Sequence, residues 1–231
     1  MKTNSLVYLL YIRLKMLYLL SALFISMHDL SNFNVYQSEI TLVIKGEEDL
    51  FFLNSAFNPE PDEVIINGQI KNSCKKSYNF TEELNDVVIK FNSTIESCEN
   101  MFAILENIIE IDLSNFDFSN VVNMTSMFYK CTNLEKINFG KINTQSVQRM
   151  DYLFNNCYKL TSIDLSNFNT SSVITMSCMF KYCTSLTSID ASMFDTKNVV
   201  DMYDIFASCY KLITVNVSSF DTLKVTILQK N

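Results

Sequence analysis

A pattern that returns every 26 residues constrains the fold of this chain more than any other feature. The pentapeptide IDLSN begins at Ile111 and Ile163, and related copies begin at Ile137, Ile189 and Val215. Three further columns keep the same spacing, namely Cys131, Cys157, Cys183 and Cys209; Met124, Met150, Met176 and Met202; and Phe102, Phe128, Phe154, Phe180 and Phe206. Because one such unit cannot bury its apolar face alone, this period predicts a stack of equivalent units.

Each unit contains an apolar signature that is typical of a strand. Residues 160–168 read L-x-x-I-x-L-x-x-F, which matches the strand signature of a leucine-rich repeat with Phe in the last position. A polar turn at 169–172 follows, of residue types that cap helix N-termini. Apolar residues then recur at offsets 0, 3, 6, 7 and 10, at Val173, Met176, Met179, Phe180 and Cys183. These offsets predict one face of a helix, so we expect strand, turn and helix in every unit. The phenylalanine column should form a continuous aromatic spine in the core.

The full repeat, S-[IL]-D-L-S-N-F-[DN]-T-S-x-V-x-x-M-x-x-M-F-x-x-C-x-x-L, resembles that of the BspA-like leucine-rich-repeat surface proteins, over roughly residues 86–231. The resemblance implies an extracellular or cell-surface protein that acts in adhesion and interaction, with no catalytic residues to carry over. The predicted fold class is α/β, a leucine-rich-repeat solenoid with a parallel sheet on its concave face and a small β-rich N-terminal cap. One copy has Gly140-Lys141-Ile142 in place of Ser-Asn-Phe, a change expected to alter the surface more than the fold.

The domain organisation has three parts. Residues 1–26 carry Lys2, Arg13 and Lys15 before the apolar run MLYLLSALFIS, which is typical of a secretory signal peptide; an uncleaved membrane anchor and a buried N-terminal helix are the alternatives. Residues 27–85 predict a β-rich cap, with alternation around Leu42 and a hairpin at 64–70 centred on Asn-Gly. A further strand is expected at 87–91. The solenoid spans 86–231, and its last unit is cut short, with Leu228 as its final core position.

The composition argues against catalysis and against several kinds of ligand. His28 is the only histidine, which leaves no partner for a Cys-His or Ser-His mechanism, and no Gly-rich phosphate motif is present. We therefore expect no enzyme activity, no cofactor and no metal. A formal net charge of −7 repels nucleic-acid backbones. Calcium on the aspartate column is a weaker idea, because only Asp164 and Asp190 are aspartates on adjacent units.

The outward positions of the predicted strands form the candidate ligand-binding face. They are Asp112, Ser114, Asn115, Asn138, Lys141, Asp164, Ser166, Asn167, Asp190, Ser192, Asn216 and Ser218. The alternative interpretation is that these residues only keep the strand face solvated and hydrogen-bonded along the stack. The expected partner is a protein or another cell-surface macromolecule, with membrane contact only through residues 1–26 if they are uncleaved.

Five Asn-x-Ser/Thr sequons, at Asn79, Asn92, Asn123, Asn169 and Asn216, are candidate glycosylation sites in a secreted protein. The cysteine column is expected to be a buried thiol ladder rather than a set of disulfides, because parallel neighbours rarely point at each other correctly. Cys98 should lie in the core, Cys178 should face solvent, and Cys74 has no evident mate. The sequence thus predicts a non-enzymatic cell-surface or secreted interaction protein; an intracellular or membrane-anchored structural scaffold is the alternative.

Overall fold

The computed structural model describes residues 36–227. The predicted targeting segment 1–26, His28 and Leu228 lie outside this range, so nothing in the structure bears on them. The described residues form strands, β-bridges and turns, and they contain no helix. The strands are β1 (Ser38–Lys45), β2 (Asp49–Phe51), β3 (Glu63–Ile66), β4 (Gln69–Ile70), β5 (Ser77–Asn79), β6 (Leu84–Phe91), β7 (Ile108–Asn115), β8 (Lys136–Asn138), β9 (Ser188–Asp190) and β10 (Thr214–Asn216).

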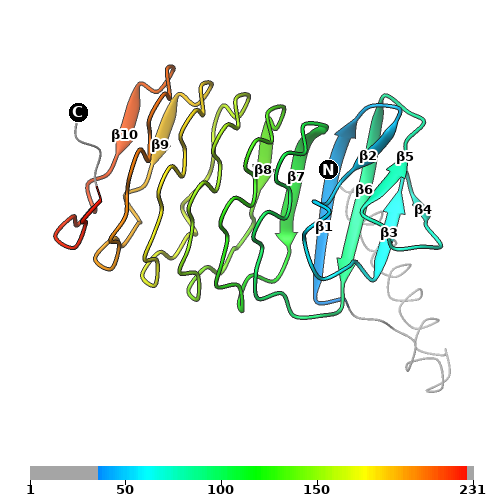
Figure 1. Cartoon of the computed structure of the whole chain (residues 1–231), viewed down its shortest axis with the longest axis horizontal. Helices are drawn as coiled ribbons and strands as arrows, with labels where there is room; N and C mark the ends of the chain where they lie inside the picture. Colours follow the sequence, from blue (N-terminus) through cyan, green and yellow to red (C-terminus); the bar gives the residue numbers. More distant parts are fainter. Residues whose placement is uncertain (1–35, 228–231) are drawn as a thin grey trace, which may run out of the picture. The chain divides into compact units, whose positions relative to one another are not determined.

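A six-stranded sheet with the order β4-β3-β6-β1-β7-β8 begins the described part of the chain (Figure 1). The predicted strand around Leu42 is confirmed as β1, in which buried and half-buried side chains alternate. The predicted Asn-Gly hairpin is confirmed as β3 and β4, with positive φ at both Asn67 and Gly68, as a tight hairpin turn requires. Strand β1 pairs antiparallel with β6 on one side and with β7 on the other. The N-terminal strands therefore cover the first repeat through backbone pairing.

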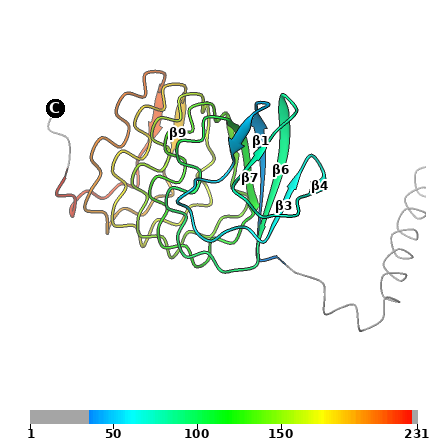
Figure 2. The same cartoon turned by 45° about the vertical axis from the view of Figure 1, so that its right-hand side comes forward.

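The repeats stack one beside the next, as Figure 1 and Figure 2 show. Parallel β-bridges link positions one period apart, from Ser97 to Asn123 and onward through Arg149, Thr175, Asp201 and Ile227. We number five coils from these positions, namely coil 1 (97–122), coil 2 (123–148), coil 3 (149–174), coil 4 (175–200) and coil 5 (201–226). Equivalent residues of adjacent coils are thereby placed side by side.

The segment predicted to be helical consists of successive turns in every coil. In coil 2 the N–H groups of Met127 and Tyr129 donate to carbonyls three residues earlier, at Met124 and Ser126. The N–H of Ser126 itself crosses to the carbonyl of Asp151 in coil 3, at 2.8 Å. Hydrogen bonds within a turn thus alternate with hydrogen bonds between coils. An α-helix would have directed all of these N–H groups to the carbonyl four residues earlier in the same coil.

Left-handed backbone conformations explain why this segment forms turns and not a helix. Ser126 and Lys130 have φ of 56° and 57°, and the equivalent positions of the other coils also have positive φ. A left-handed residue interrupts a right-handed helix, and two of them in each segment exclude one. The predicted α/β leucine-rich-repeat class is therefore wrong. Each turn spans three residues, so apolar residues three positions apart lie on one face of the coil without forming a helix.

The continuous parallel sheet expected along the repeats is also wrong. β7 of coil 1 pairs in parallel with β8 of coil 2, and β9 of coil 4 pairs with β10 of coil 5. Residues 161–165 of coil 3, which lie between these pairs, form no strand. In this part of the described chain, no backbone hydrogen bond joins residues 136–139 to residues 161–165. The sheet is thus interrupted after β8.

The core is built from the columns that the period predicts. The rings of Phe102, Phe128, Phe154, Phe180 and Phe206 stack in order, with centroids 5.7, 5.3, 5.4 and 5.8 Å apart. This confirms the aromatic spine. A buried threonine column, which the sequence analysis had assigned to a helix-capping turn, links the coils from inside. For example, the Thr170 hydroxyl donates to the carbonyl of Asp195 in coil 4, at 3.0 Å.

Candidate binding groove

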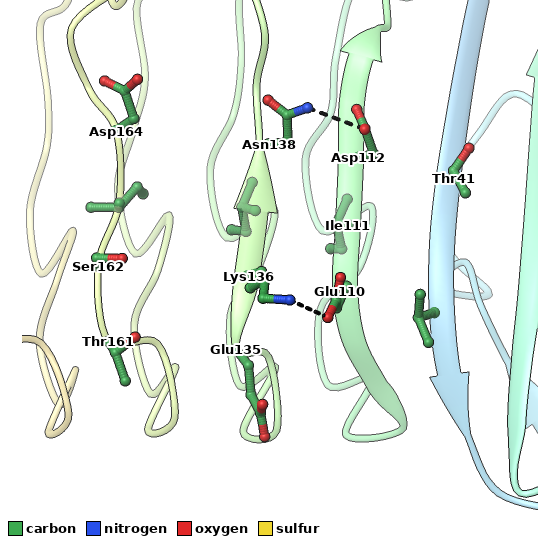
Figure 3. A pocket seen from close by; sticks show the side chains of 13 residues that line it. Thr41, Glu110, Ile111, Asp112, Glu135, Lys136, Asn138, Thr161, Ser162 and Asp164 are labelled. Carbon is green, nitrogen blue, oxygen red and sulfur yellow. Dashed lines mark hydrogen bonds and ion pairs between the residues drawn. The ribbon is translucent and has the colours of Figure 1, made fainter.

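A groove of about 620 Å³ crosses the outer face of the sheet at its interruption (Figure 3). It extends from β1 across β7 and β8 to coil 3. The lining residues are Thr41, Val43, Glu110, Ile111, Asp112, Glu135, Lys136, Ile137, Asn138, Thr161, Ser162, Ile163 and Asp164. The volume is within the usual range for a small-ligand site.

Two pairs of side chains join β7 to β8 across the groove. The Asn138 amide donates to Asp112 Oδ2 at 3.1 Å, and Lys136 Nζ lies 2.7 Å from Glu110 Oε1 (Figure 3). Asp164 stands on the far side, on coil 3, with no such link to Asn138 (Figure 3). The groove therefore has one rim held by a hydrogen bond and an ion pair, and a second rim that carries a separate carboxylate.

The column that contains Asp112 and Asp164 has a structural role in every coil. Each of its side chains accepts the backbone N–H two residues later, which closes a tight turn of the kind that Asp and Asn favour. The acceptors are Asp112, Asn138, Asp164, Asp190 and Asn216, with distances of 2.8, 3.0, 2.9, 3.0 and 3.3 Å. Turn formation therefore accounts for the repeated Asp or Asn, independently of any ligand.

The structure brings only three of the predicted face residues into the groove. These are Asp112, Asn138 and Asp164; the other predicted residues line other parts of the surface. Ser114, Asn115, Lys141, Ser166, Asn167, Asp190, Asn216 and Ser218 are exposed, and Ser192 is half-buried. The Asn167 amide donates to the carbonyl of Gly140 at 3.1 Å, which ties coil 3 to coil 2 beside the groove.

Several groove residues are not among those predicted from the sequence. Glu110, Lys136 and Ser162 precede the IDLSN copies by one residue, and outward alternation along the strand could have identified them. Thr41 and Val43 come from the N-terminal strands. Only the pairing of β1 with β7 brings them there, and no local sequence pattern encodes that pairing.

Local hydrogen bonds favour the charged form of the aspartates in the groove. The hydrogen bond from the Ser166 side chain, together with that from its backbone N–H, lowers the pKa of Asp164. Burial works in the opposite direction at Asp112, but hydrogen bonds from Ser114 and Asn138 outweigh it, so this pKa is also lowered. Both carboxylates are therefore ionised at neutral pH.

Gly140 has a structural role in the contact between coil 1 and coil 2. Its φ is +54°, and a Cβ at this position would lie 2.7 Å from the Cβ of Ser114. The replacement of Ser by Gly in this copy therefore permits a close approach of coil 2 to coil 1. The expectation that the change alters the surface more than the fold is wrong for Gly140.

The cysteine column is a ladder of free thiols, as predicted. Each Sγ donates to the carbonyl of the phenylalanine 29 residues earlier, for example from Cys157 to Phe128 at 3.2 Å. Cys98 is buried in the core, and this prediction is confirmed. Cys178 was expected to face solvent, but it is only 3% exposed, because the neighbouring Tyr152 and Ser177 side chains contact its thiol. Cys74 is half-buried and donates to the carbonyl of Asp62 at 3.0 Å.

Three of the five sequon asparagines, Asn79, Asn169 and Asn216, are exposed, whereas Asn92 and Asn123 are half-buried. In residues 36–227, no group of three or more His, Cys, Asp or Glu side chains is arranged to hold a metal ion. The same part of the chain has no helix that is long and apolar enough to cross a membrane.

Comparison with known proteins identifies the family of this chain. No match was found among curated proteins, and none among solved structures. One family model, described as "Mycoplasma protein of unknown function, DUF285", matches residues 71–163 and again residues 96–214. The second match alone covers more than half of the chain and includes most of the stacked coils. The chain therefore belongs to the DUF285 family.

Proposed function

We propose that this protein is a non-enzymatic binding module, secreted or displayed at a cell surface, which recognises another protein or cell-surface macromolecule through the groove side of its stack. In this respect it would act as the BspA-like surface proteins do, to which its repeat is similar. The basic and apolar segment at residues 1–26 supports export or anchoring at a membrane.

The observation that carries the proposal is the groove. It lies on a surface whose residues are held in fixed positions from one coil to the next. Its polar side chains stand on coils that backbone hydrogen bonds hold in register, such as the bond from Ser126 to Asp151. Buried columns support the same coils from inside, through stacked rings and the Thr170 hydroxyl. A surface that is ordered before binding loses little conformational entropy when a partner binds, which favours recognition.

The exposed sequons are consistent with the same proposal. Asn79 lies at the end of β5 and Asn169 at a corner of coil 3, and both are open to solvent. In a eukaryotic secretory pathway, either could accept a glycan without entering the core.

The experiment is protease shaving of intact cells that express the full chain with a C-terminal epitope tag. Loss of the tag from intact cells is expected if the stack is displayed outside. A glycosidase mobility shift that disappears in the Asn79→Gln variant would locate one glycan and show passage through the secretory pathway. Full protection of the tag in intact cells, with digestion after lysis, would refute surface display and favour an internal scaffold.

A further inference from the structure

The floor of the groove is apolar at the point where the sheet is interrupted. Ile111, Ile137, Ile163 and Ile189 belong to one column of the repeat. Ile111 and Ile189 are each only 2% exposed. Ile137 and Ile163, on either side of the interruption, are only half-buried. Two side chains of a core column are thus accessible from the groove.

Two of the four carboxylates beside this floor lack a cationic partner. Glu110 is paired with Lys136 at 2.7 Å, and Glu135 lies 3.9 Å from Lys159. Among the described residues, neither Asp112 nor Asp164 has a lysine or arginine within ion-pair distance. The groove therefore combines an aliphatic strip with two ionised carboxylates that no side chain of the protein neutralises.

We propose that the groove binds a basic segment of a partner protein, by accepting a lysine side chain whose methylenes cover Ile137 and Ile163 and whose ammonium group pairs with the Asp164 carboxylate. Lysine has this combination of an aliphatic stem and a charged end. The net charge of −7 attracts such a segment from a distance. A divalent cation suits the groove poorly, because calcium requires six to eight oxygen ligands and gains nothing from an apolar floor.

This inference rests on the proposed function and specifies the chemistry of the partner. It requires two separate contributions, one from the Asp164 carboxylate and one from the apolar floor. Each contribution can be removed alone.

The carboxylate is tested with fluorescein-labelled pentalysine and the purified full chain, by fluorescence anisotropy. The Asp164→Asn variant should weaken binding about tenfold, since a hydrogen bond to a charged group is replaced by a neutral one. Asp190→Asn is the matched control, because Asp190 occupies the same column one coil later, accepts the equivalent bond from Ser192, and does not line the groove. The control should bind within about twofold of the wild type, because a distant surface charge contributes little.

The apolar floor is tested with a pentamer of 2,4-diaminobutyrate, whose side chains are two methylenes shorter, at about pH 6 so that the amines of both peptides remain charged. This peptide should bind several-fold more weakly than pentalysine, because less apolar surface is buried. Equal affinity for the two peptides would overturn the proposal, as would equal losses in the Asp164→Asn and Asp190→Asn variants, or no binding of pentalysine at all. None of these results alters the shaving experiment, so a failure of this inference is distinguishable from a failure of surface display.

Discussion

Replacing Phe154 with alanine should lower the free energy of unfolding by about 4 kcal/mol. The Phe154 side chain is fully buried, and its ring stacks between Phe128 and Phe180 at 5.3 and 5.4 Å. Burial of a phenylalanine contributes up to about 3 kcal/mol, and each aromatic pair adds about 0.5 kcal/mol or more. The total is within the range of about 3–5 kcal/mol that is typical of Phe-to-Ala substitutions in cores.

The matched control for this change is Phe206→Ala, in the same column. Phe206 is only partly buried, and Phe180 at 5.8 Å is its one stacked neighbour among the described phenylalanines. We expect this variant to lose about half as much stability as Phe154→Ala. Urea denaturation of both full-length variants, followed by circular dichroism, measures the two values. A loss below about 1 kcal/mol at Phe154, or a larger loss at Phe206, would refute the stacked spine.

Three further predictions concern the threonine column, the thiol ladder and the aspartate turns. Thr170→Val should cost about 1–3 kcal/mol in urea denaturation, because it leaves a half-buried carbonyl of the next coil without its donor, whereas Thr161→Val, at an exposed position, should cost almost nothing. Burial raises the pKa of Cys131 to about 12, so iodoacetamide at about pH 8 should alkylate this thiol only after unfolding; rapid labelling of the native protein would contradict its burial. The pKa of Asp164 is lowered in the folded state, so the contribution of its carboxylate to stability is present above the unfolded pKa of about 3.9 and is lost as pH falls through the folded pKa. The Asp164→Asn variant should therefore lose less stability in acid than the wild type. An unchanged dependence of stability on pH would contradict this role.

The core columns could be predicted from the sequence because burial in a repeat depends only on the period. Phe154 and Cys157 belong to columns that repeat every 26 residues, and both lie in the core whatever the local backbone conformation is. The strands at residues 38–45 and 84–91 could also be predicted, because their alternation is unambiguous.

The turns could not be predicted, because apolar residues three positions apart are compatible both with a helix and with consecutive turns. The deciding feature is the left-handed conformation of residues such as Ser126, Lys130 and Tyr152. Glycine usually signals that conformation, and the sequence has only three glycines. The groove was only partly predictable for a different reason. The presence of Thr41 and of the half-buried Ile163 in the groove depends on strand pairing and on the interruption of the sheet, which are tertiary features.

The most direct test of this structure is the detection of hydrogen bonds between coils by NMR, through the scalar couplings that cross them. The stack and its groove exist only if successive coils pair along the turn segments, as the Ser126 N–H does with the Asp151 carbonyl at 2.8 Å. A long-range HNCO spectrum of the deuterated full chain should show a cross-peak between the Ser126 nitrogen and the Asp151 carbonyl carbon. A cross-peak from Ser126 to the Val122 carbonyl carbon instead would reveal a helix in this segment and contradict the stack of turns.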